Sequence, residues 1–226
     1  MITFQNVEKL YPPNTIALED VSFKIKKGEF LLLAGRSGTG KTTLLKLILA
    51  QEHPTKGRVF FSGQDVHKIK KQELPYLRRK IGAVFQDYKL LTSKTIFENI
   101  AFIMEVMGSN NEEIQLNVPK VLEIVGLENK MQNFPKELSS GQLQRAAIAR
   151  ALIHRPLVIL ADEPTGNLDP HNTSEIIGLL QKINEFGTTV ILATHNRDVI
   201  KKLKKRTIVL ENGKIVRDDE KGELVL

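Results

Sequence analysis

The stretch FLLLAGRSGTGKTTLLKLILA, residues 30–50, decides the fold of this chain. It opens with a continuous apolar run that ends in Gly35, and it closes with apolar residues at helical spacing. The segment between them, GRSGTGKT at 35–42, fits the pattern G-x-x-x-x-G-K-[ST]. The stretch therefore predicts a buried strand, a glycine-rich loop and a helix, in that order.

Two more apolar runs share the character of that first strand. They are LVILAD at 157–162 and TVILATH at 189–195. Between them, NTSEIIGLLQKINEFG at 172–187 has the spacing of a helix that ends at Gly187. Because alternating strands and helices form parallel sheets with helices on their faces, we expect a parallel sheet.

The remaining segments have other patterns. ITFQNVEKL at 2–10 and VSFKIKK at 21–27 alternate apolar and polar residues, which is typical of a half-buried antiparallel sheet. Residues 87–155 hold no comparable buried strand and have helical patterns, with Pro119 and Pro135 expected as breaks. The sequence indicates helices inserted into an α/β core.

Near the end of the chain, TIVLENGKIVRDD at 207–219 places Asn212-Gly213 between two apolar runs, which predicts a β-hairpin. The fold expected is an α/β P-loop NTPase core of mixed sheet, with an antiparallel β-subdomain and an inserted α-helical subdomain. We expect a single domain, in which 1–86 and 156–226 form the core and β-subdomain and 87–155 the helical subdomain.

Composition excludes several classes of protein. Hydrophobic residues make up 41% and charged residues 26% of 226 residues, which are globular values. There are 0 Cys, so disulfide scaffolds and thiolate metal sites are excluded. No signal-peptide pattern and no apolar run of the roughly 18 residues needed to span a bilayer is present, so we expect no membrane insertion by this sequence itself.

The formal net charge of +7 favours an anionic partner such as a nucleotide, a nucleic acid or a lipid headgroup. Basic residues gather at 68–71, 78–80 and 201–206, where solvated helix faces are the favoured interpretation. With 0 Trp and 3 Tyr, aromatic platforms for single-stranded nucleic acid are scarce, and we expect no nucleic-acid partner.

The loop at 35–42 has the chemistry of a phosphate cradle. Glycines let successive backbone N–H groups point at phosphate oxygens, and the helix that follows adds its positive end. Lys41 supplies a full positive charge, and the hydroxyl of Thr42 is a ligand for Mg²⁺.

Three polar residues follow buried strands and are candidates for the chemistry. Asp162 and Glu163 end one strand, at the edge where open α/β sheets bind ligands. Asp162 is placed to hold Mg²⁺, and Glu163 to orient and deprotonate the water that attacks a γ-phosphate. His195 ends the next buried strand and becomes a candidate γ-phosphate contact. The competing interpretations are that the two acids cap a helix and that the histidine is structural.

LSSGQ at 138–142 opens a helix, with a serine as its expected cap and Gly141 just before the first turn. It is a second helix start suited to anions. Since one cradle already binds a triphosphate, a second suggests that two chains each contribute half of a composite site. A plain capped helix remains the alternative for this segment.

Taken together, these residues resemble the ATP-binding subunits of ABC transporters, over essentially the whole chain. The resemblance implies an Mg²⁺-dependent ATPase that dimerises on ATP and drives a separate integral membrane subunit, peripheral to the cytoplasmic side of the cell membrane. Its signature motif here departs from LSGGQ, because Ser140 stands at a glycine position. That serine is expected to affect turnover more than binding.

The resemblance assigns roles residue by residue. Glu163 is the general base and His195 the switch histidine. An aromatic that stacks on adenine falls on Tyr11, and the Q-loop glutamine on Gln86. The nucleotide-binding residues implied are Tyr11, Gly35, Arg36, Ser37, Gly38, Thr39, Gly40, Lys41, Thr42, Thr43, Gln86, Ser139, Ser140, Gly141, Gln142 and Asp169, and the metal ligands are Thr42, Gln86 and Asp162.

Within the family, RRKIGAVFQDYKLLTSKTIFENIAF at 78–102 looks like the cell-division branch. Lipoprotein-release and macrolide-export ATPases, the alternatives, more often carry Phe-Asn at the positions of Tyr88-Lys89. A GTPase is excluded because Asn129-Lys130 is not followed by x-Asp. A DNA-associated ATPase would need a longer insertion, and a ribosome-associated factor a second P-loop.

Overall fold

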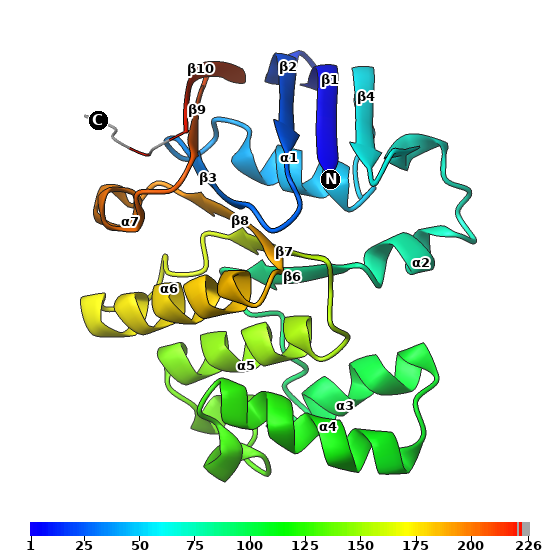
Figure 1. Cartoon of the computed structure of the whole chain (residues 1–226), viewed down its shortest axis with the longest axis vertical. Coiled ribbons are helices and arrows are strands. Elements are labelled where there is room, and N and C mark those ends of the chain that lie inside the picture. Colours follow the sequence, from blue (N-terminus) through cyan, green and yellow to red (C-terminus); the bar gives the residue numbers. More distant parts are fainter. Residues whose placement is uncertain (221, 223–226) are drawn as a thin grey trace. The chain divides into compact units, whose positions relative to one another are not determined.

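The computed structural model describes residues 1–220 and 222, and the chain divides into two compact units (Figure 1). Unit 1 comprises Met1–Arg78 together with the chain from Ile183 onward, and unit 2 comprises Arg79–Lys182. The expected helical segment, 87–155, lies inside unit 2, which also holds two strands and most of a further helix. The subdomain boundaries at 87 and 155 stay a prediction.

Unit 1 contains an antiparallel sheet in the order β2-β1-β4-β5. Its strands are β1 (Ile2–Tyr11), β2 (Thr15–Ile25), β4 (Lys56–Phe61) and β5 (Gln64–Asp65). Ile2 and Phe4 of β1 are buried at the expected period of two, and a register shift between Phe4 and Val7 then brings Val7 to the buried side. The rings of Phe4 and Phe23 stack across β1 and β2 with their centroids 4.6 Å apart. The expected antiparallel sheet is therefore present.

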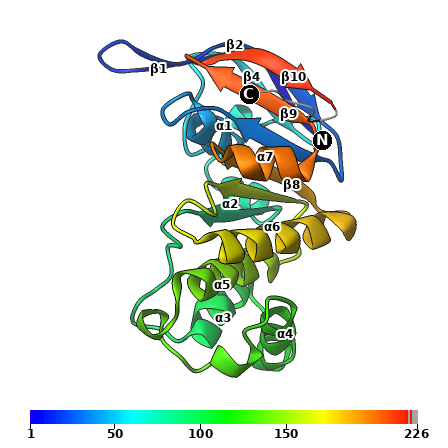
Figure 2. The same cartoon turned by 90° about the vertical axis from the view of Figure 1, so that its left-hand side faces the viewer.

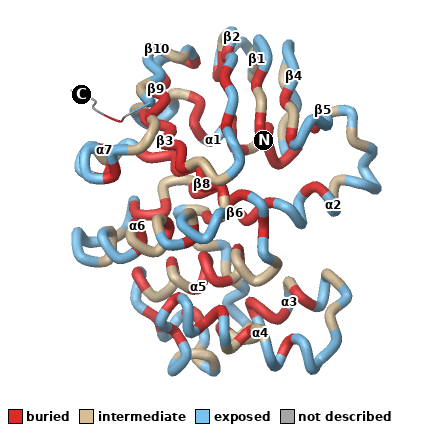
Figure 3. The backbone as a smooth tube through the Cα atoms, in the orientation of Figure 1, coloured by how far each residue is buried: buried red, intermediate tan, exposed pale blue. Residues whose placement is uncertain are grey.

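Unit 1 also contains four neighbouring strands in the order β10-β9-β3-β8. Strand β3 (Phe30–Ala34) runs parallel to β8 (Thr189–Thr194) and to β9 (Thr207–Glu211), whereas β10 (Lys214–Asp219) runs antiparallel to β9. Every residue of β3 and β8 is buried, as Figure 3 shows in red. These pairings confirm a mixed sheet built on apolar runs.

The helices of unit 1 are short. They are α1 (Lys41–Ile48), α2 (Leu74–Arg78), α7 (Arg197–Leu203) and the 3₁₀ turn η1 (Val66–Lys68). The β9–β10 hairpin turns at Asn212 and Gly213, whose φ angles of 48° and 79° are both left-handed. That is the conformation that an Asn-Gly hairpin favours, and the predicted hairpin is confirmed.

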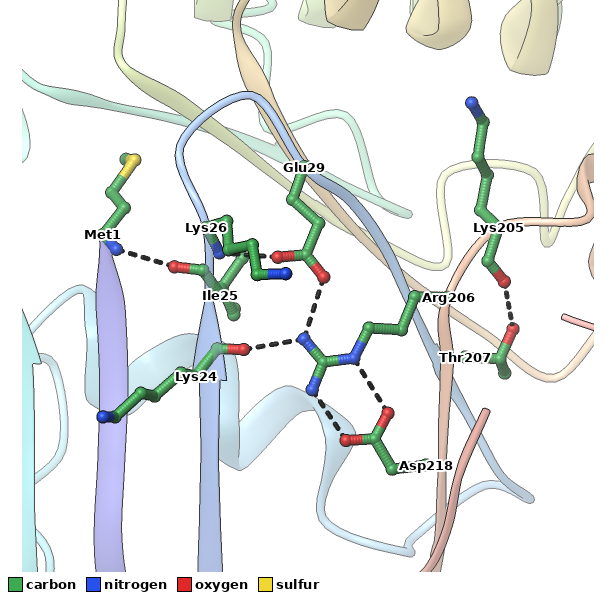
Figure 4. A network of polar contacts seen from close by, with 9 residues as sticks. All are labelled: Met1, Lys24, Ile25, Lys26, Glu29, Lys205, Arg206, Thr207 and Asp218. Carbon is green, nitrogen blue, oxygen red and sulfur yellow. Dashed lines mark hydrogen bonds and ion pairs between the residues drawn. The ribbon is translucent and has the colours of Figure 1, made fainter. Parts of the chain in front are cut away.

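Arg206 ties three segments of unit 1 together (Figure 4). Its guanidinium donates to the carbonyl of Lys24 at 2.7 Å, to Glu29 at 2.8 Å and to both carboxylate oxygens of Asp218 at 2.6 and 2.8 Å. The side chain thereby links the end of β2, the turn before β3 and strand β10.

Unit 2 combines two strands with the larger helices. Strand β6 (Ile81–Phe85) runs parallel to β7 (Val158–Asp162). The helices are α3 (Ile96–Met107), α4 (Asn111–Ile124), α5 (Ser140–Leu152) and α6 (Pro170–Glu185), with 3₁₀ turns η2 (Glu128–Lys130) and η3 (Pro135–Glu137). Helices α3, α4 and α5 pack on one another (Figure 2), and α5 packs on β6.

Capping boxes start three of these helices. Thr95 pairs with Glu98 at α3, Asn110 with Glu113 at α4, and Ser139 with Gln142 at α5. In each box two side chains satisfy backbone N–H groups that the first turn leaves without partners. Local sequence therefore fixes where these helices begin.

One predicted helix break is wrong. Pro119 lies inside α4. A proline there lacks the N–H that would bond the carbonyl of Gln115, at a cost of about 3 kcal/mol. The capping box at Asn110 and burial of Ile114, Val118 and Leu122 along one face offset that cost. Pro135, by contrast, begins η3, as a proline at a helix start should.

Among residues 1–220 and 222, no helix is both long and apolar enough to span a membrane.

Candidate functional site

The glycine-rich loop of unit 1 joins the end of β3 to the start of α1. Gly35, Gly38 and Gly40 all have positive φ angles, of 153°, 81° and 104°. Space is also restricted, since a Cβ on Gly35 would lie 2.5 Å from the carbonyl oxygen of Leu210, and one on Gly40 would lie 2.8 Å from Cδ2 of Leu18. Glycine is therefore required at the first and last glycine of the motif, for conformation and for space.

Lys41 directs its ammonium into this loop. Its Nζ donates to the carbonyl of Gly35 at 2.7 Å and to that of Arg36 at 2.9 Å, and the residue is 5% exposed. Thr42, the next residue, lies exposed in the first turn of α1, whereas Thr43 is buried. A positive charge, a helix N-terminus and an accessible hydroxyl thus lie together, which suits an anionic ligand with a hard cation.

Strand register brings His195 to the same edge as this loop. Ala34 pairs with Thr194, so Gly35 and His195 each follow the paired ends of β3 and β8. Asn196, the next residue, caps α7 by accepting from the backbone N–H groups of Asp198 and Val199. His195 is therefore held between a buried strand and a capped helix.

A cavity of about 590 Å³ lies over this edge. It is lined by His195 and much of the glycine-rich loop, together with Arg197, Glu211 and Asn212. The sequence alone did not mark these last three as site residues. Asn212 was expected only as a turn residue, and no local pattern marks Arg197 or Glu211. The lining is Ala34, Gly35, Arg36, Ser37, Thr39, His195, Arg197, Ile200, Val209, Glu211 and Asn212.

Tyr11 ends strand β1 and is half-buried. It pairs with Thr15 of β2, and β2 continues to Ala17 and Leu18, the neighbours of Gly40. The ammonium of Lys9 lies 4.7 Å from the centroid of the Tyr11 ring. The predicted adenine-stacking residue therefore belongs to the hairpin that packs on the glycine-rich loop.

In unit 2, the parallel strands β6 and β7 end at the same level. Phe85 pairs with Asp162, so Gln86 and Glu163 are the next residues at one sheet edge. Asp162 and Glu163 are half-buried, and Gln86 is exposed. Register thus brings together three of the residues expected to act on a nucleotide and its metal.

The chain turns sharply at Glu163, whose φ of 47° is left-handed. Such a conformation costs a non-glycine residue of order 1 kcal/mol or more and is concentrated at functional sites. The backbone N–H of Gly166 closes the turn on the carbonyl of Glu163 at 3.1 Å. Nε2 of Gln86 donates to Oδ1 of Asn167 at 3.2 Å, which joins the two loops.

Ser139 caps helix α5, as predicted, but the helix includes the residues that follow. Its Oγ accepts from the N–H of Gln142 at 3.4 Å, and Oε1 of Gln142 accepts from the N–H of Ser139 at 3.0 Å. Gly141 was expected just before the first turn and instead forms part of it, since the capping box starts the helix at Ser140. Ser140 is exposed and Gly141 is buried.

Asp169 lies just before α6 and caps its first turn. Its Oδ1 accepts from the backbone N–H groups of His171 at 2.9 Å and Asn172 at 3.0 Å. Its Oδ2 accepts from the side-chain amide of Asn172. These hydrogen bonds, chiefly those from Asn172, lower the pKa of Asp169. The carboxylate is committed to the helix start.

The predicted site residues thus fall into two sets. Unit 1 groups the glycine-rich loop, His195 and the β1–β2 hairpin that carries Tyr11. Unit 2 groups Gln86, Asp162, Glu163, the helix start at 139–142 and Asp169. No cluster of three or more His, Cys, Asp or Glu side chains suited to a metal occurs in the part of the chain that the structure describes.

The chain is similar to known proteins over nearly its whole length. A family model described as ABC transporter matches residues 18–166. The cell division ATP-binding protein FtsE of Streptococcus pneumoniae serotype 2 is 48% identical over 223 residues, covering 99% of this chain and 97% of that protein. FtsE of Bacillus subtilis strain 168 is 47% identical, covering 99% and 98%. A dimeric structure of the ATP-binding cassette MJ0796 in a post-hydrolysis state bound to ADP and Pi has a TM-score of 0.89 and 36% identity, covering 97% and 98%.

Proposed function

The chain belongs to the ABC transporter family of ATP-binding proteins, alongside its FtsE relatives, and from that premise we propose that it hydrolyses ATP to drive a membrane protein in cell division. The observation that carries the activity is the glycine-rich loop of unit 1, where Lys41 lies among the loop carbonyls at the N-terminus of α1. Such a loop binds the phosphates of a nucleotide through backbone N–H groups and one lysine.

Hydrolysis is assigned to residues at the strand ends. Glu163, which follows β7 in a left-handed turn, is the general base that takes a proton from the attacking water. His195, at the edge shared with the loop, contacts the γ-phosphate as charge develops on it. Tyr11 stacks on adenine, and its hairpin packs on the loop at Gly40.

Mg²⁺ is the cation that these residues fit. Thr42, Gln86 and Asp162 offer hydroxyl, amide and carboxylate oxygens, and a hard cation that retains several waters needs few protein ligands. When bound, the ion neutralises charge on the β- and γ-phosphates.

We assign the helix start at 139–142 to the nucleotide of a second copy. Ser139 and Gln142 satisfy each other's N–H groups, and exposed Ser140 occupies the first turn of α5. The related cassette MJ0796 is dimeric in a structure bound to ADP and Pi. A homodimer that ATP brings together, with each chain completing the other's site, accounts for a second anion-binding helix start on this chain.

The membrane partner is assigned to the loop at 86–95, named here the docking loop. Arg150 of α5 donates to the carbonyls of Tyr88 at 2.8 Å and Lys89 at 2.5 Å, two consecutive left-handed residues. Asn99, 1% exposed, donates to three further carbonyls of the segment and accepts from the N–H of Leu91. The loop is thus held in one shape, with Leu91 exposed.

The occupant we assign is a short apolar helix of an FtsX-type membrane subunit, on the cytoplasmic side of the cell membrane. An amphipathic helix laid in an apolar groove is a common mode of such docking. Phe102 and Val106, one turn apart on α3, are also exposed apolar side chains. The work proposed is mechanical, namely activation of peptidoglycan hydrolases across the membrane during division.

The test of the activity is steady-state phosphate release by the purified chain with ATP and Mg²⁺. Glu163→Gln should lose nearly all hydrolysis and keep ATP binding, because a neutral amide does not accept the proton. Lys41→Ala should weaken binding instead. Glu185→Gln, an exposed acid at the end of α6, is the control and should match the parent. A parent chain without hydrolysis would overturn the function, and an active Glu163→Gln the assignment of the base.

A further inference from the structure

The starts of helices α5 and α6 contact each other at Gly141. Gly141, the second residue of α5, is buried, and a Cβ built on it would lie 2.6 Å from Cγ of Asn172 and closer still to its Oδ1. The φ of Gly141 is not in the left-handed region, so glycine is needed for space alone. The side chain of Asn172 therefore fills the volume directly above this glycine.

Asp169 fixes the orientation of Asn172. Nδ2 of Asn172 donates to Oδ2 of Asp169, and the backbone N–H of Asn172 donates to Oδ1 at 3.0 Å. With Nδ2 committed to Asp169, Oδ1 is the amide atom turned toward Gly141. The lowered pKa of Asp169 keeps its carboxylate charged and the amide anchored.

Two further contacts join the same segments. Nη1 of Arg145 on α5 donates to Oε2 of Glu175 on α6 at 2.5 Å, one turn beyond the contact of Asn172 with Gly141. On the other side, Gln86 donates to Asn167, and a Cβ on Gly166 would lie 2.8 Å from its Nε2. The segment 166–172 is thus held at one end by Gln86 and at the other by the helix start of α5.

We infer that Asn172 is a positioning residue, which transmits displacement of the segment 166–169 to the helix start at 139–142. The inference rests on the proposed function, because that function gives both segments their part in hydrolysis. Asn172 has no spare freedom to absorb a displacement, since its amide is bonded on one side and packed on the other. A shift of Asp169 must therefore move Gly141 or break a hydrogen bond.

The test is a double-mutant cycle on the full chain, with ATP hydrolysis and thermal melting as readouts. Asn172→Asp sets a second carboxylate against that of Asp169 without changing side-chain volume. We expect kcat to fall about tenfold with little change in the KM for ATP, since the phosphate loop lies on other residues. In the double variant Asp169→Asn/Asn172→Asp the amide and the carboxylate exchange places. Its kcat relative to the parent should exceed the product of the relative kcat values of the two single variants about tenfold.

Asn117→Asp is the matched control, because Asn117 is also a helical asparagine of unit 2, and its amide donates to the backbone carbonyl of Glu113 at 2.8 Å rather than to a carboxylate. It should keep the parental kcat. If Asn172→Asp melts without cooperativity, Asn172→Ala takes its place and should give the same loss of kcat at unchanged KM. The inference is overturned if the Asn172 variant has the parental kcat, or if the relative kcat of the double variant equals the product of those of the two single variants. A parent without ATP hydrolysis overturns the proposed function instead.

Discussion

Two buried side-chain amides in unit 2 differ in whether they make hydrogen bonds. Asn99 is 1% exposed and makes four hydrogen bonds, all to Leu91, Lys94 and Thr95 of the docking loop. Gln144 on α5 is 0% exposed, and neither its Oε1 nor its Nε2 has a hydrogen-bond partner among the described residues. A buried amide without partners costs about 1–3 kcal/mol, so the two residues should respond oppositely to an apolar replacement.

Gln144→Leu is expected to raise the free energy of unfolding by about 1 kcal/mol, because it removes an unsatisfied amide at similar volume. Asn99→Leu is the matched comparison and should lower that free energy by about 2 kcal/mol or more, because it leaves the carbonyls of Leu91, Lys94 and Thr95 without their donor. Urea unfolding measures both. A loss of stability in Gln144→Leu would show that this amide contributes favourable interactions.

His67 makes the stability of unit 1 depend on pH. Burial, and then the neighbouring His53, lower its pKa to about 4, and the two rings lie 5.2 Å apart. Because the unfolded chain binds a proton near pH 6.5 and the folded chain does not, stability is full above that pH and falls as pH drops toward 4.

We expect the free energy of unfolding of the parent to fall by about 1 kcal/mol as the pH is lowered from 7.5 to 5.5, and that of His67→Leu to show no such fall. The comparison is made by urea unfolding at both pH values. His154, whose pKa is also lowered by burial, is present in both proteins and cancels. Equal pH dependence in the two proteins would exclude His67 as the source.

At the scale of elements, the sequence predicted what local chemistry determines. The strand, loop and helix at 30–48, the Asn-Gly hairpin and the cap at Ser139 all depend on neighbours in sequence. Pro119 was wrongly expected to break a helix because tertiary burial of Val118 and Leu122 outweighs the cost of one proline. Strand β6, IGAVF at 81–85, was missed because so short an apolar run fits strand and helix alike.

In the candidate site, too, some residues could be predicted from local sequence and others depend on tertiary packing. Lys41, Glu163 and His195 could be predicted because each follows a recognisable strand or motif. Arg197 and Glu211 enter the cavity only through the packing of α7 and the β9–β10 hairpin beside β3. The contact of Asn172 with Gly141 joins residues far apart in sequence, and no spacing pattern marks it. Tertiary contacts of this kind need the structure.

Arg206 supports an arrangement of elements that no single strand determines. Its bonds to Lys24, Glu29 and Asp218 raise its pKa, chiefly through Asp218. We expect Arg206→Met to lower the free energy of unfolding by about 2 kcal/mol, since it leaves Glu29 and Asp218 without their partner. Arg206→Lys should recover only part, because an ammonium lacks the planar fork. Lys201→Met, at an exposed lysine, is the control. If urea unfolding gave Arg206→Met the same free energy of unfolding as the parent, Arg206 would not be the stabilising link.

At the scale of the whole molecule, the residues proposed to bind phosphate and those proposed to activate water belong to different compact units. Gln86, the docking loop, the helix start at 139–142 and Glu163 all belong to unit 2. Arg150 and Asn99 bind the docking loop to α5 and α3 of that unit. A partner seated on the docking loop would therefore act directly on the unit that carries the proposed general base.

Binding of that partner should depend on the exposed side chains of the docking loop. We take Tyr88 and Leu91 of the loop, with Phe97 in the first turn of α3, as the anchors. Leu91 is the most accessible, at 39%, while the other two are half-buried. Loss of one buried anchor costs an interface about 2 kcal/mol, or roughly thirtyfold in affinity. Leu91→Ser should therefore abolish co-purification with an FtsX-type subunit while basal ATP hydrolysis and the melting temperature persist.

Phe186→Ser is the control. Phe186 follows the last residue of α6 and is 91% exposed, so its loss removes a larger apolar surface outside the loop and should leave co-purification intact. Retention of the partner by Leu91→Ser, or its loss in Phe186→Ser, would move the docking surface away from residues 86–95.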